Sequence, residues 1–137
     1  MFKNRRITEI LPSLWYSLKQ DKDLPHEIDI EPRDIEEISK DSFIVEAYFN
    51  NDKEPTSMDD ISLSYTNYNS VLNPISGKIQ SQLKETYDKK KPISYEGEFT
   101  TDDDRLVKYR QALVPFKAED DKYIYVIGAV RWKIYKK

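Results

Sequence analysis

The chain of 137 residues contains no cysteine, one histidine and three glycines. Without cysteine it can form no disulfide, thiolate nucleophile, zinc–thiolate site or cysteine-linked flavin adduct. His26 is therefore the one side chain whose ordinary pKa suits acid–base chemistry near neutral pH. The glycines form neither of the common glycine-rich phosphate loops. These shortages argue against nucleotide hydrolysis and thiol chemistry.

Long apolar runs are also missing. No stretch approaches the roughly 18 residues needed to cross a bilayer, and the first residues lack the features of a secretory signal. We therefore expect a cytoplasmic protein with no membrane partner. The net charge of -3, with 34% charged residues, is typical of a soluble globular protein and does not favour nucleic acid as a partner.

Three stretches show the apolar spacing of amphipathic helices. The stripe of the first consists of Ile10, Leu11, Leu14, Trp15 and Leu18. Pro12 favours a start at about Leu11, because proline lacks the amide hydrogen that an interior position donates. A second, short helix is expected to open at Pro32, and a third to cover residues 76–91 with Ser76 as its cap.

Five stretches show the pattern of strands, at residues 41–51, 61–67, 92–99, 105–116 and 122–135. In the second, Ile61, Leu63 and Tyr65 alternate with polar residues, which predicts one dry face. The predicted fold class is α+β, a five-stranded antiparallel sheet with helices on one side. Residues 1–40 would form an N-terminal helical extension that packs on the sheet, and residues 41–137 the sheet-bearing domain.

Four short motifs follow one another along the chain: Leu14–Trp15, Leu24–Pro25, "DIEP" at Asp29–Pro32, and "RQALVPF" at Arg110–Phe116. In order and spacing they resemble those of stand-alone bacterial PAS-domain proteins, over about residues 14–134. A five-stranded antiparallel sheet with helices inserted between the second and third strands is the plan of a PAS domain. The segment "ISLSYTNYNSVLNPISG" departs from the arginine- and glycine-rich strand of that group. The resemblance implies a sensory or adaptor module without catalytic residues.

The leading hypothesis is a non-enzymatic PAS-type sensory or protein-interaction module in signal transduction. It would act by binding a small molecule, by forming a homodimer, or by docking onto a signalling protein such as a kinase. No cofactor is specified; His26 is read as a solvated connector residue, with haem ligation as the other option. The alternative is a small cone-shaped α+β enzyme of the isomerase or hydratase kind, with an Asp or Glu base beside tyrosine donors. A third hypothesis is a structural partner-binding module with a filled core.

A small-molecule ligand is predicted to lie between the inner face of the sheet and residues 65–83, where irregular connections meet apolar strands. The candidate ligand-binding residues are Leu63, Tyr65, Asn67, Leu72, Ile79, Leu83, Tyr95, Arg110, Val126 and Val130. A register slip of one residue would exchange this set for its alternate. No catalytic or metal-binding residue is predicted, because the acidic segment 101–105 reads better as a solvated hairpin turn than as a calcium loop.

Two further features concern packing. The candidate interface residues Leu11, Leu14, Trp15 and Leu18 are expected to pack on the outer face of the sheet or on the equivalent helix of a partner. Gly128, in the middle of the last strand, either makes room for a ligand or relieves crowding against a large neighbour such as Trp15. We favour crowding.

Overall fold

The computed structural model describes residues 6–50 and 62–135. Its elements, in chain order, are α1 (Ile7–Lys19), η1 (Glu27–Asp29), α2 (Pro32–Ser39), β1 (Phe43–Asn50), β2 (Ser62–Thr66), η3 (Ser70–Leu72), α3 (Asn73–Lys89), β3 (Ile93–Thr100), β4 (Leu106–Lys117) and β5 (Tyr123–Tyr135). The strands form one antiparallel sheet in the order β2-β1-β5-β4-β3. The predicted α+β class is confirmed, with η3 and α3 inserted between β2 and β3 as expected.

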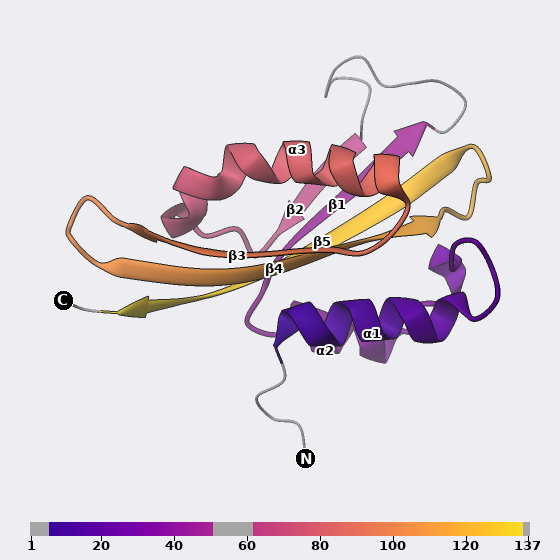
Figure 1. The fold of residues 1–137 in the computed structure, drawn as a ribbon, viewed down its shortest axis with the longest axis horizontal. Coiled ribbons are helices and arrows are strands. Elements are labelled where there is room, and N and C mark those ends of the chain that lie inside the picture. Colours follow the sequence, from indigo (N-terminus) through magenta and orange to yellow (C-terminus); the bar gives the residue numbers. More distant parts are fainter. Residues whose placement is uncertain (1–5, 51–61, 136–137) are drawn as a thin grey trace.

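Helices cover both faces of the sheet (Figure 1). On one face lies α3, where the Tyr87 ring stacks on Phe49 with 4.6 Å between ring centroids. On the other lie α1 and α2, the N-terminal extension. Since side chains alternate along a strand, Val126 and Gly128 point toward α3, whereas Tyr125 and Arg131 point toward the α1 face. The predicted packing of the extension on the outer face is therefore observed.

Helix α1 begins at Ile7, four residues before the predicted start, so Pro12 lies inside it. Ile7, Leu11 and Trp15 are buried and recur every fourth residue, which directs one stripe at the sheet. Ile7 is only 1% exposed and adds a turn to this stripe. The packing of that turn contributes more stability than the helical hydrogen bond lost at Pro12 would have given. Helix propensity does not include this packing, so it could not predict the start at Ile7.

Among the described residues, the last residues of β4 have no strand neighbour on one side. Strand β3 begins at Ile93, which pairs with Leu113, so β4 extends beyond it. At this edge Pro115 has no amide to satisfy, and its carbonyl accepts a hydrogen bond from the Trp15 indole. The Trp15 side chain thus packs on the sheet and also completes its edge.

The connector after α1 covers the end of the same edge. The amide of Lys117 donates to the carbonyl of Pro25 at 2.9 Å, and His26 bridges Lys117 in parallel. His26 is partly buried by this pairing rather than fully solvated. The "LP" segment therefore has a structural role in joining the extension to β4.

The other expectations on local structure hold in part. Helix α2 begins at Pro32 as predicted, but α3 begins at Asn73 with Pro74 in its first turn, so Ser76 is an interior residue and not the cap. The predicted dry face of β2 is wrong, because Tyr65 is 44% exposed on this edge strand and Leu63 is half-buried. Ile61 lies outside the described residues.

Segment 101–105 forms the hairpin turn predicted for it. The Arg105 amide donates to the Thr101 hydroxyl at 3.0 Å, and the Arg105 guanidinium pairs with Asp103 at 2.9 Å. Gly128 relieves crowding, as favoured, but against different neighbours. A Cβ there would lie 3.0 Å from Val45 Cγ1 and 3.1 Å from Leu113 Cγ, while Trp15 is on the opposite face.

Candidate functional site

Except for Arg110, the residues predicted to bind a ligand line neither the concavity described below nor a smaller hollow between α1 and α2. Leu72, Ile79, Leu83, Val126 and Val130 are each at most 1% exposed and belong to one hydrophobic core. Leu63 and Tyr95 pack on its margin, whereas Tyr65 and Asn67 lie at the exposed end of β2. Side chains of α3 thus pack against the sheet in the region where the sequence placed a pocket. Spacing along the chain locates apolar faces, but it does not reveal how closely two faces approach.

Arg110 was grouped with this set, and that assignment is wrong. Its neighbours in β4, Tyr109 and Gln111, point toward α3, where Gln111 contacts Gln82. Arg110 therefore points to the α1 face, where its Nε lies 3.1 Å from Glu96 Oε2. It cannot share a ligand with Val126 or Tyr95.

The candidate interface residues divide in the same way. Leu11 is 0% and Trp15 2% exposed, both against the sheet of their own chain. Leu14 and Leu18 are partly buried against the same core. Of the two alternatives for this stripe, packing on the outer face of its own sheet is the one observed.

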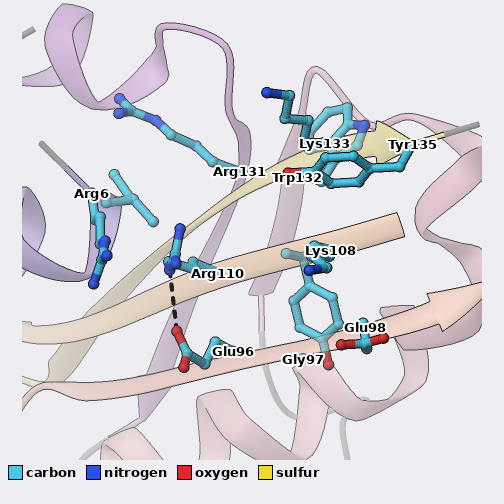
Figure 2. A pocket seen from close by; sticks show the side chains of 12 residues that line it. Arg6, Glu96, Gly97, Glu98, Lys108, Arg110, Arg131, Trp132, Lys133 and Tyr135 are labelled. Carbon is cyan, nitrogen blue, oxygen red and sulfur yellow. Dashed lines mark hydrogen bonds and ion pairs between the residues drawn. The ribbon is translucent and has the colours of Figure 1, made fainter. Parts of the chain in front are cut away.

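Arg110 instead lies in a charged concavity of about 650 Å³ on the α1 face (Figure 2). It lies over β3, β4 and β5, next to the start of α1. We call it the cationic concavity and define it by the charged side chains Arg6, Glu96, Glu98, Lys108, Arg110, Arg131 and Lys133, with Tyr135 at its edge. Five cationic and two acidic side chains give it a formal charge of +3, in a chain whose net charge is -3.

The strand register arranges these charges in two rows. Glu96, Arg110 and Arg131 lie directly opposite one another across β3, β4 and β5, and Glu98, Lys108 and Lys133 form the next row. On β4 and β5 each row therefore places two cations opposite each other. Like charges in directly opposed positions destabilise a sheet. Two such pairs side by side therefore lower the stability of the folded protein, and stability does not explain their presence.

Arg131 is held in place without losing its charge. Its Nε donates to the Ser42 hydroxyl at 2.8 Å and its Nη2 donates to the Glu37 carbonyl at 3.0 Å. Both acceptors are neutral, and Glu37 lies near the end of α2, where a helix dipole favours a cation. The guanidinium is thereby oriented, and no carboxylate within residues 6–50 and 62–135 forms an ion pair with it.

The two lysines lie around an aromatic ring. Their Nζ atoms are 5.5 Å (Lys108) and 5.4 Å (Lys133) from the centroid of the Tyr135 ring. Neither forms an ion pair with a carboxylate within residues 6–50 and 62–135. An anion entering this end of the concavity would meet two cations and an apolar wall.

Tyrosine–carboxylate pairs, which the enzyme hypothesis requires, occur elsewhere on the α1 face. The Tyr48 hydroxyl donates to Glu27 at 2.5 Å and the Tyr125 hydroxyl donates to Glu46 at 2.7 Å. Burial, reinforced by these hydrogen bonds, raises the pKa of both tyrosines far above the ordinary value. None of the four residues lines the cationic concavity or the smaller hollow between α1 and α2. The Tyr48–Glu27 hydrogen bond joins η1 to β1, and the Tyr125–Glu46 hydrogen bond joins β1 to β5. The enzyme alternative stays a prediction.

A third pair, between Tyr95 and Glu85, makes a prediction at high pH. The hydrogen bond from Tyr95 to the Glu85 carboxylate is the main cause that raises the pKa of Tyr95 from 10.0 to about 12. A raised pKa in the folded state means that this stabilisation is complete below pH 10 and is lost as the pH approaches 12. Glu85→Gln should therefore move the pKa of Tyr95 back toward 10.0. Titration of tyrosinate absorbance would detect the shift.

Tyr95→Phe is the control for that titration, because it removes the group itself. One late-titrating tyrosine should be missing from this variant and should titrate earlier in Glu85→Gln, while the late titration of Tyr48 and Tyr125 stays in both. Identical titration curves for the wild type and Glu85→Gln would show that the hydrogen bond does not control the pKa of Tyr95.

Apart from Arg110, sequence reasoning missed the concavity. A signal was present in the alternation of Lys108 with Arg110 and of Arg131 with Lys133, which gives each strand two cations on one face. This signal predicts a cationic surface only when the β4–β5 register is known, because the register places the two cations of β4 opposite the two cations of β5.

No protein-family model and no curated protein matches this chain. Among the described residues, no helix combines the length and the apolar character required to span a membrane.

Proposed function

We propose that the protein is a non-enzymatic PAS-type sensory or protein-interaction module in cytoplasmic signalling, and that the cationic concavity is its binding surface. Two features of the chain support the module. Helices are inserted between β2 and β3 of a five-stranded antiparallel sheet, and the "LW" and "LP" motifs of the extension bond to the end of β4, at and just after the "RQALVPF" motif. These features concern architecture and carry no catalytic assignment.

The observation that carries the binding surface is the two pairs of opposed cations on β4 and β5. The face toward α3 is closed by packed side chains, so a ligand or partner has to engage the protein from outside. Arg110 opposite Arg131, and Lys108 opposite Lys133, form the charged centre of the larger described concavity. Such a surface is typical of recognition, because it lowers the stability of the free protein and gains favourable contacts only when an oppositely charged group binds.

Native mass spectrometry of freshly purified protein tests this function. We expect a retained small molecule, or a second subunit, in the wild type. Lys108→Glu combined with Lys133→Glu should remove that species, because both substitutions reverse the charge of the concavity. Lys78→Glu combined with Lys122→Glu, both at exposed positions elsewhere, changes the net charge equally and should retain it. A bare monomer in the wild type and in both double variants would contradict the proposed function.

A further inference from the structure

We propose that the cationic concavity binds a small molecule that carries two anionic groups, phosphates or carboxylates, joined by a short linker. This inference rests on the proposed function, since it names the ligand class of the same surface. It follows from the geometry of the two cation pairs, from the way in which Arg131 is held, and from the size of the concavity.

The two pairs set the spacing of the anionic groups. Directly opposite residues on neighbouring antiparallel strands have Cβ atoms about 4.5–5.5 Å apart, which lets one anionic group contact both members of a pair. Residues two apart on one strand are separated by about 6.6–6.8 Å. The register thus gives the concavity two pairs of cations, Arg110 with Arg131 and Lys108 with Lys133, and each pair can serve one anionic group. In Figure 2 the Arg131 side chain extends away from Arg110, toward Ser42 and Glu37.

The two cation pairs of the concavity differ in chemistry. At the arginine end, Arg131 is already oriented by Ser42 and by the carbonyl of Glu37, so little side-chain freedom is lost when it binds an anion. Because Nε and one hydrogen of Nη2 are used in this way, the edge formed by Nη1 and Nη2 is the one that can donate two hydrogen bonds to a phosphate or carboxylate. Arg110 is partly neutralised by Glu96, so Arg131 is the principal anion contact in this row.

At the lysine end, the positive charges are less restrained. Lys108 and Lys133 lie beside the Tyr135 ring, which offers an apolar surface for the linker of the ligand. Glu98 lies opposite Lys108 and is the acidic group that opposes an anion here. Removing the carboxylate of Glu98 should therefore tighten binding, whereas removing the lysines should weaken it.

The size of the site favours a small molecule over an acidic chain. A volume of about 650 Å³ falls within the range of ordinary small-molecule sites, roughly 300–1,000 Å³. Arg6 at the start of α1 and Tyr135 at the end of β5 both line the concavity. A single small dianion can contact both cation pairs within this space.

Isothermal titration calorimetry with defined probes tests the inference. Inorganic phosphate supplies one anionic group, and tripolyphosphate supplies two terminal groups held apart by a third phosphate. We expect tripolyphosphate to bind at least tenfold more tightly than phosphate, and its affinity to fall as salt screens the charges. Lys108→Ala combined with Lys133→Ala should weaken tripolyphosphate binding by about tenfold or more, because two charge-assisted contacts are lost.

The matched control is Lys78→Ala combined with Lys122→Ala, which removes the same charge from exposed positions outside the concavity. It should leave the affinity within about twofold of the wild type, while Glu98→Gln should increase it. Circular dichroism would confirm that each variant is folded. Equal weakening in both lysine pairs would overturn the site, as would no detectable binding of tripolyphosphate by the folded wild type. Binding of an acidic peptide in place of tripolyphosphate would overturn the small-molecule class.

These outcomes separate the inference from the proposed function. A retained neutral molecule that is indifferent to the lysine substitutions would leave the PAS-type module standing, but it would overturn both the anion site and the concavity as the binding surface of that module. If the protein instead converts a bound dianion to a new product, the anion site is correct and the non-enzymatic module is wrong.

Discussion

Replacing Trp15 by alanine should lower the free energy of unfolding by about 3–5 kcal/mol. The indole is 2% exposed between α1 and β4, and its N–H donates to the carbonyl of Pro115 at an edge that β3 does not reach. Alanine removes both the buried ring and the hydrogen bond. Denaturant unfolding followed by circular dichroism would measure the loss.

Two further variants divide this effect into its parts. Trp15→Phe keeps a ring in the same place but leaves the Pro115 carbonyl unpaired, and it should cost about 1–3 kcal/mol. Ile28→Ala alters a residue that is 69% exposed and should change stability by less than about 0.5 kcal/mol. A loss below about 1 kcal/mol for Trp15→Ala would contradict the packing of α1 described above.

Replacing Val126 by phenylalanine should destabilise the protein by about 1–3 kcal/mol or more. Val126 is 0% exposed, faces α3 and lies in register between Ala47 and Pro115. The predicted ligand pocket would have accommodated the larger ring with the fold intact, but the packed core leaves it no space. The measurement is again the free energy of unfolding.

Ile134→Phe is the matched control for Val126→Phe. It adds a ring to the same face of β5 at a residue that is 38% exposed, so stability should change by less than about 0.5 kcal/mol. If Val126→Phe is as stable as the wild type, a cavity must exist beneath α3 and the ligand site predicted from the sequence regains support.

The helices and strands were predictable because their signals are local. Alternation of apolar residues located all five strands to within about two residues, and Pro32 marked the start of α2. The errors occurred where a tertiary contact decided a boundary. Burial of Ile7 extended α1 through Pro12, and α3 began at Asn73 instead of using Ser76 as its cap.

The binding hypothesis was only partly predictable. Arg110 was identified as a residue suited to an acidic ligand, but it was assigned to the wrong face of the sheet. The same two-residue periodicity that placed Val126 toward α3 also fixes Arg110 on the α1 face once the β4–β5 register is known. Arg131 and Lys133 join it there because hydrogen bonding between strands places residues far apart in sequence directly opposite one another.

By itself, the sequence determined the α+β class, the order of the elements and the absence of cysteine chemistry, since composition and apolar period suffice for these. Tertiary structure alone decided that the space under α3 is filled, that Trp15 closes the open edge of β4, and that four cations meet on the opposite face. The physical reason is that volume, edge pairing and opposed charge are properties of two or more segments in contact. The pattern along one segment predicts which residues share a face. Strand register and helix packing alone determine which residues of other segments contact that face.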